Sequence, residues 1–191
     1  MPEYTHTLLA MLGGQPQVVT FTLDLLLQRF PISEVIVIHP HATQERLQHS
    51  LRCLNAEFVG DCYRINGRTI HLRSHVLQLD ETPLDDITDD ISANGALDTI
   101  HQLIRELKRQ PRCIHLSVTG GRRLMALTAI SAAQLNFKHN IDHIWHLYSP
   151  EEVIQRARDG RIMHILPEDG GESDRDPFRS LKYLFLYYFS D

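Results

Sequence analysis

The chain has 191 residues and a formal net charge of −5, and these values exclude several classes of protein. Hydrophobic residues make up 42% and charged residues 23%, as in a globular domain with its own core. The negative charge disfavours coating of double-stranded nucleic acid, and no run approaches the ~20 apolar residues that cross a bilayer. Three cysteines without a C-x-x-C pattern fit a reducing compartment. We therefore expect a cytoplasmic protein with no membrane segment.

Strands and helices alternate through the first part of the chain. Residues 5–12 are mostly apolar, as in the central strand of a parallel sheet, and a glycine and proline turn precedes a helix over 18–29. The β-branched run 34–39 predicts a second strand, followed by a helix over 43–54. This order predicts an α/β fold with parallel strands.

The middle of the chain is less regular. The dipeptide Asn66-Gly67 favours a tight turn, so the segments beside it are expected to form a small β-hairpin insertion near residues 58–79. The acidic stretch 80–90 contains Pro83 and is interpreted as a solvated loop.

The second half of the chain alternates again. The patterns predict helices over 92–108, 124–137 and 150–159, and strands over 113–116, 142–147 and 162–166. We therefore expect one domain over residues 1–166. In the remaining 167–191, an acidic stretch is expected to be mobile. The apolar run 181–189 is expected to pack on the domain or on a second subunit.

Two glycine loops follow predicted strands and precede predicted helices. They are Gly13-Gly14-Gln15 and Thr119-Gly120-Gly121-Arg122. In an open parallel sheet, ligands bind outside the carboxyl ends of the strands, and glycines let the backbone approach an anion at a helix N-terminus. Neither loop has the G-x-G-x-x-G pattern or a following Lys-Ser/Thr, which disfavours nicotinamide and P-loop enzymes.

Two arginines at one of these helix starts strengthen the prediction of an anion. Arg122 and Arg123 oppose the helix dipole, so they are better explained by a negative ligand than as surface charges. Gly120 and Gly121 can also serve only to turn the chain.

The histidines do not predict a metal site. The pairs His39/His41 and His143/His146 have no cysteine or carboxylate at ligand spacing, and H-E-x-x-H is absent from the sequence. His39 ends a strand on the expected ligand side and is a minor candidate for lining a pocket.

The sequence resembles the CARF-domain proteins of type III CRISPR systems, most of all the stand-alone ring nucleases. The resemblance rests on Leu-Gly-Gly-Gln-Pro-Gln-Val-Val-Thr at 12–20 and Thr-Gly-Gly-Arg-Arg-Leu-Met at 119–125, and it extends to about Leu166. It implies a Rossmann-like homodimer that binds a cyclic oligoadenylate, most often the tetramer. It also implies cleavage without metal or cofactor, in which a ribose 2′-hydroxyl attacks the adjacent phosphorus and leaves a 2′,3′-cyclic phosphate.

The resemblance assigns roles to the residues of both loops. The catalytic positions fall on Gln15 and Arg123, where the ring nucleases have serine and lysine. Gln15 can hydrogen-bond a phosphate and Arg123 can stabilise developing charge, but neither is a general base. The expected ligand-binding residues are Gly13, Gly14, Gln17, His39, Thr119, Gly120, Gly121 and Arg122.

Two alternatives stay open from the sequence. A CARF sensor would hold the ring without cleaving it and regulate a partner protein. A nucleotide- or sugar-phosphate-binding enzyme would share only the Rossmann architecture, because fold does not fix function.

Overall fold

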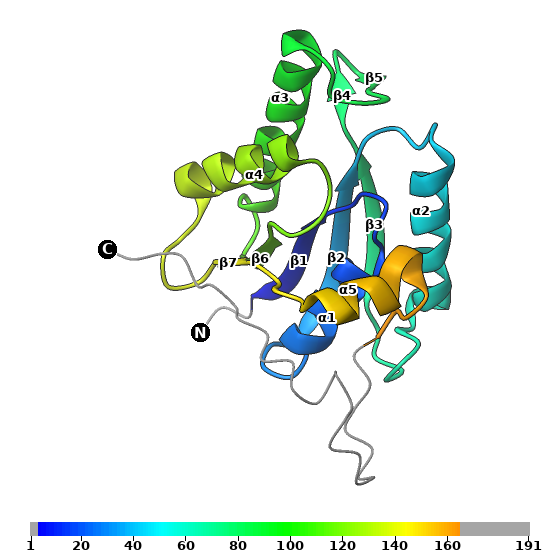
Figure 1. Cartoon of the computed structure of the whole chain (residues 1–191). Coiled ribbons are helices and arrows are strands. Elements are labelled where there is room, and N and C mark those ends of the chain that lie inside the picture. The colour runs from blue at the N-terminus through cyan, green and yellow to red at the C-terminus, as the bar shows by residue number, and fades with distance from the viewer. Residues whose placement is uncertain (1–3, 165–191) are drawn as a thin grey trace, which may run out of the picture.

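Five parallel strands form the centre of the molecule in the computed structural model, which describes residues 4–164 (Figure 1). The order across the sheet is β3-β2-β1-β6-β7, and β1 pairs with β2 on one side and with β6 on the other. The strands are β1 Thr5–Met11, β2 Ile32–His39, β3 His71–Val76, β6 Arg112–Ser117 and β7 His143–Trp145. The expected α/β fold with a mostly parallel sheet is confirmed.

Helices cover both faces of this sheet (Figure 1). They are α1 Gln17–Leu26, α2 Glu45–Glu57, α3 Asp90–Leu107, α4 Arg123–Asn136 and α5 Glu151–Ala157, with short 3₁₀ turns η1 Val59–Asp61 and η2 Arg158–Gly160. One apolar cluster joins the sheet to α1 and α2, and another joins it to α3 and α4. Neighbouring residues of β1 therefore enter different cores: Leu8 and Leu9 are both fully buried, on opposite faces.

The strand order creates a switch point beside β1. The chain winds outward from β1 to β2 and β3, and then returns to the other side of β1 with β6 and β7. The connections after β1 and β6 therefore diverge to opposite faces, which leaves a crevice at their carboxyl ends. Both glycine loops lie at this crevice.

The small antiparallel hairpin lies later in the chain than expected. It pairs β4 Gln78–Leu79 with β5 Thr82–Pro83, and the turn residues Asp80 and Glu81 both have positive φ. Around Asn66-Gly67 the chain makes one antiparallel bridge, between Cys62 and Thr69. The segment beyond it becomes β3, because it pairs in parallel with β2 and extends the main sheet.

Other boundaries also differ from the sequence-based expectations. Part of the acidic stretch 80–90 is ordered, since it supplies β5 and also Asp89, which caps α3 in a capping box with Ser92. Residues 162–164 form no strand. The tail 167–191 lies outside the described residues. Within residues 4–164, no helix is both long and apolar enough to cross a membrane.

Candidate functional site

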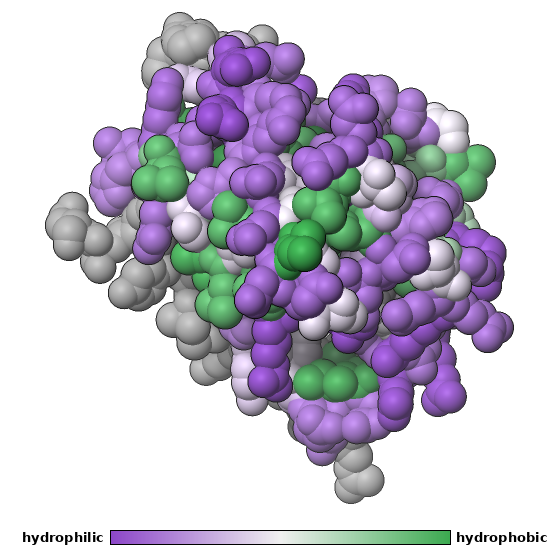
Figure 2. All heavy atoms as spheres, turned by 90° about the horizontal axis from the view of Figure 1, so that it is seen from above, coloured by the Kyte–Doolittle hydropathy of each residue, from purple (hydrophilic) through white to green (hydrophobic). Residues whose placement is uncertain are grey.

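A cavity of about 460 Å³ lies at the switch point, at the carboxyl ends of β1, β2 and β6. Its lining combines apolar side chains with glycine backbone and charged groups: Leu12, Gly13, Gly14, Gln15, Val18, Pro40, Gln44, Arg46, Leu47, Asp85, Asp86, Gly120, Gly121 and Arg122. The face seen from above in Figure 2 is mainly hydrophilic, with small apolar patches. Six of the lining residues were expected from the sequence to form a site: Gly13, Gly14, Gln15, Gly120, Gly121 and Arg122.

The two glycine loops touch each other through their backbones. A β-carbon on Gly13 would lie 3.2 Å from the Cα of Gly121, and one on Gly120 would lie 2.6 Å from the carbonyl oxygen of Met11. Gly120 and Gly121 also have φ values of 103° and 64°, which favour glycine. The loops thus need glycine to turn and to pack together, whatever ligand the cavity holds.

Charge at the cavity is balanced between arginines and aspartates. Arg122 is the N-cap residue of α4 and makes a bidentate ion pair with Asp86, with its Nε 3.0 Å from Oδ1. Arg46 donates from Nη2 to Oδ1 of Asp159 at 3.1 Å. Both arginine side chains are more than half exposed, so these pairs contribute little stability, and Arg122 can exchange Asp86 for a ligand anion.

Hydrogen bonds fix the side chain of Gln15 at the cavity wall. Its Nε2 donates to Oδ1 of Asp159 at 3.1 Å, and its Oε1 accepts from Nε2 of Gln17 at 2.6 Å and from the backbone N–H of Asp159 at 3.1 Å. Gln17 is itself buried, and its Oε1 accepts from the backbone N–H of Gly160. Gln17 therefore supports Gln15 and does not line the cavity.

Three other expected site residues do not line the cavity. Arg123 is exposed on the first turn of α4. The hydroxyl of Thr119 accepts from the backbone N–H of Leu147 at 2.7 Å. His39 is buried, with Nδ1 2.6 Å from the carbonyl oxygen of Pro40 and Nε2 bonded to Ser74. Burial lowers the pKa of His39, so the neutral form of this side chain is favoured.

Sequence reasoning missed Arg46, Asp85 and Asp86. Arg46 lies on α2 and Asp85 and Asp86 lie in the acidic stretch after β5, so none is close in sequence to a glycine loop. The sequence indicates these residues only through their place in the chain: both segments follow strands whose carboxyl ends reach the same edge of the sheet.

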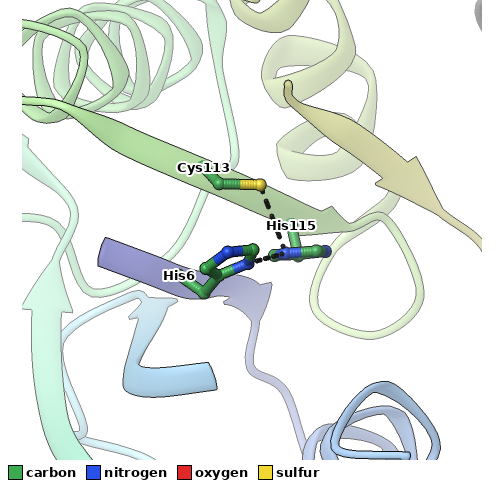
Figure 3. Close-up of side chains that lie close together, drawn as sticks. All are labelled: His6, Cys113 and His115. Atoms are coloured by element: carbon green, nitrogen blue, oxygen red, sulfur yellow. Dashed lines mark hydrogen bonds between the residues drawn. The ribbon is translucent and has the colours of Figure 1, made fainter. Parts of the chain in front are cut away.

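A second polar cluster lies at the opposite, amino end of the strands, on β1 and β6 (Figure 3). One ligand atom each from His6, Cys113 and His115 lies within 4.8 Å of the others, which is a spacing that a metal ion can bridge. The Nδ1 of His6 is 3.1 Å from the Nε2 of His115, and the Sγ of Cys113 is 3.4 Å from the same nitrogen.

The protonation states of these three side chains favour a hydrogen-bonded structural role over metal binding. Trp145 donates from Nε1 to Nδ1 of His115 at 3.2 Å, so neutral His115 carries its proton on Nε2 and donates it to His6. Burial, with His143 and His6 nearby, lowers the pKa of His115 to about 2. Burial and the charge of Asp142 raise the pKa of the Cys113 thiol to about 12, whereas a metal needs the thiolate.

The open parallel sheet defines a Rossmann-like fold, and the polar cavity at its switch point is the candidate ligand site. The family model of CRISPR-associated protein NE0113 matches residues 15–184, and the chain belongs to this CRISPR-associated family. Among curated proteins, none matches the chain.

Solved structures that resemble part of this chain include Can2, Csm6 and a Vibrio protein. Can2 from Sulfobacillus thermosulfidooxidans, solved with cyclic tetra-adenylate, is 15% identical with a TM-score of 0.45 over 75% of this chain and 32% of its own. Csm6 from Enterococcus italicus, bound to cyclic hexa-2′-fluoro-hexa-dAMP, is 14% identical with a TM-score of 0.48 over 78% of this chain and 35% of its own.

Protein VC1899 from Vibrio cholerae is 17% identical, with a TM-score of 0.49 over 75% of this chain and 30% of its own. The chain thus spans about a third of the length of these proteins. At these scores the likenesses carry no conclusion about its ligand.

Proposed function

We propose that this protein is a CARF-type ring nuclease that binds a cyclic oligoadenylate, most simply cyclic tetra-adenylate, as a homodimer in the cytoplasm. It would thereby switch off type III CRISPR signalling. The observation that carries the proposal is the cavity between the two glycine loops, in a chain of a CRISPR-associated family. Parts of the motifs at 12–20 and 119–125, which resemble CARF proteins, line this cavity together with residues 40–47 and 85–86.

The groups at the cavity suit a phosphodiester. Backbone of Gly13, Gly14, Gly120 and Gly121 lines it, the helix α4 begins beside it, and Arg46 and Arg122 offer donors that fit phosphate oxygens. Val18 and, to a smaller extent, Leu47 supply apolar surface against which an adenine base can pack.

The size of the cavity supports a dimer. At about 460 Å³ it is at the smaller end of ligand pockets, whereas a ring of four nucleotides is much larger than one drug-sized molecule. Two such cavities that face each other across a two-fold axis would hold the ring together. Exposed Arg123, which lies outside the cavity of one protomer, would then be free to reach the ring.

Cleavage proceeds by positioning and charge stabilisation. The 2′-oxygen forms a bond to phosphorus, the bond from phosphorus to the 5′-oxygen breaks, and the 5′-oxygen takes up a proton as the 2′-hydroxyl loses one. Gln15 and Arg123 would orient the phosphate and stabilise its added charge. Among the lining residues, Asp85 and Asp86 carry groups that accept a proton, and Asp86 is already paired with Arg122.

The second candidate is a sensor that binds the ring and leaves it intact. It is favoured by the engagement of Gln15, because both of its polar atoms already bond to Asp159 and Gln17. A nucleotide-binding enzyme is a third candidate, because a cavity of about 460 Å³ suits a mononucleotide within one protomer.

One experiment separates these candidates. Purified protein in excess is incubated with labelled cyclic tetra-adenylate and cyclic hexa-adenylate in EDTA, and the products are resolved by chromatography. We expect loss of the tetra-adenylate ring and products that end in a 2′,3′-cyclic phosphate. An intact ring after hours contradicts the nuclease; tight binding of that ring then identifies the sensor. Thermal stabilisation by AMP, but not by either ring, identifies the mononucleotide enzyme.

A further inference from the structure

Asp159 joins three segments of the chain at the edge of the candidate cavity. It lies in η2 with a positive φ of 57°, far in sequence from both of its main partners. Its Oδ1 accepts from Nε2 of Gln15 and from Nη2 of Arg46, each at 3.1 Å. Its backbone N–H donates to Oε1 of Gln15, and its backbone oxygen is 3.0 Å from Nε2 of His49. One residue thus holds two lining side chains.

Gly14 places the guanidinium of Arg46 from the other side. A β-carbon on Gly14 would lie 2.2 Å from Nε and 2.8 Å from Cζ of Arg46. The φ of Gly14 is not positive, so a side chain here would be opposed by the Arg46 side chain, which would have to move. Arg46 therefore lies across the first glycine loop, in contact with the loop and with Asp159.

With these contacts made, Arg46 and Gln15 each still have N–H groups that can donate to a ligand. Arg46 uses one of its five N–H donors on Asp159, and its half-exposed side chain lines the cavity. The amide of Gln15 cannot flip without losing its bond from the N–H of Asp159, so its second N–H keeps one direction. Side chains that are already ordered lose less entropy when they bind a ligand.

We propose that Asp159 is a positioning residue, which holds Arg46 and Gln15 ready for a phosphate of the ligand. This inference rests on the proposed binding of a cyclic oligoadenylate. In the opposite arrangement, the Asp159 carboxylate acts as an internal anion that competes with the ligand for Arg46. Removal of the carboxylate would then tighten binding. The geometry favours positioning, because a single N–H of Arg46 is engaged and because the backbone of Asp159 also holds Gln15.

The test compares Asp159→Ala with Asp159→Asn by calorimetric titration of cyclic tetra-adenylate. We expect Asp159→Ala to weaken binding about tenfold, by analogy with the loss of a partner that orients a metal-ligating side chain. Asp159→Asn keeps an Oδ1 acceptor and should retain most of the affinity. Asp98→Ala removes the same charge at an exposed position of α3 and should bind as the wild type does. Equal or tighter binding by Asp159→Ala overturns the inference.

A second measurement keeps this test separate from the proposed function. If the wild-type protein binds no ring, the proposed function fails, and the order of the Arg46 guanidinium is then measured by NMR relaxation in ¹⁵N-arginine-labelled protein. Asp159→Ala should mobilise this group, and Asp159→Asn should leave it ordered. An Arg46 side chain that is equally ordered in all three proteins contradicts the positioning role. Because Asp159→Asn is nearly isosteric, it remains informative if Asp159→Ala fails to fold.

Discussion

At two glycines of the cavity, the missing β-carbon leaves room for a neighbouring group. Gly14 lacks the β-carbon that would collide with Arg46, and Gly120 lacks the one that would collide with the backbone of Met11. The first collision is with a movable side chain and the second is with backbone. A substitution at Gly14 should therefore affect the ligand, whereas one at Gly120 should affect folding.

Arg123 gives the first prediction at this scale. We expect Arg123→Ala to lower ring affinity or cleavage at least tenfold, because the guanidinium can contact a phosphate directly. The melting temperature should change little, since Arg123 is exposed and lies where the helix dipole disfavours a cation. Ring cleavage in EDTA and thermal unfolding check both parts. A large fall in melting temperature would mean that the arginine is structural, and Arg109→Ala on another exposed segment is the matched control.

At the scale of elements, a histidine ties the segment after η2 to two helices. The Nδ1 of His164 is 3.3 Å from Oδ2 of Asp24 on α1, and its Nε2 is 2.7 Å from Oε2 of Glu57 on α2. The hydroxyl of Tyr63 donates to Asp24 at 2.6 Å. Burial alone would lower the pKa of His164, but hydrogen bonds and charge from both carboxylates outweigh it and raise the pKa. The charged form of His164 is therefore favoured by two carboxylates, of which Glu57 is buried and Asp24 is partly buried.

This arrangement predicts how stability depends on pH. Because the folded pKa of His164 is raised above its ordinary 6.5, its stabilisation is fully present below pH 6.5 and is lost as pH rises through the folded pKa. Relative to His164→Gln, the wild type should be more stable at pH 6, by on the order of 1–3 kcal/mol, and this advantage should shrink by pH 9. Urea unfolding across this range measures it. A constant difference between the two proteins would contradict the prediction.

For the molecule as a whole, the strand order decides where the ligand can bind. Reversal of the order beside β1 brings together loops that are more than 100 residues apart and opens a cavity that is small for a cyclic tetranucleotide. The proposed site, built by two copies of the chain, would explain this mismatch.

The corresponding prediction concerns stoichiometry. Calorimetric titration of a non-cleavable cyclic tetra-adenylate analogue should give one ring per two chains, and sedimentation should show a dimer in the complex. One ring per chain, or a monomeric complex, would show that one protomer holds the ligand alone. AMP serves as the control, since a mononucleotide in one cavity should bind with one molecule per chain.

Local patterns in the sequence predicted most of the fold. The β-branched run of β2 and the apolar β1 identify buried parallel strands, and the glycine loops mark the carboxyl ends of β1 and β6. The hairpin was misplaced, because Asn66-Gly67 is a strong local signal but β3 gains more by pairing along β2. Arg46, Asp85 and Asp159 carry no local signal, because each depends on a neighbour far away in sequence.

The sequence by itself determined the fold class, the two glycine loops and the resemblance to CRISPR-associated proteins, because these depend on residue order over short spans. Tertiary structure alone decided that Arg46 lies over Gly14, that Asp159 holds both Arg46 and Gln15, and that His39 is buried against Pro40 and Ser74. The physical reason is that a parallel sheet joins distant segments at one edge, so the contents of its crevice depend on packing between elements.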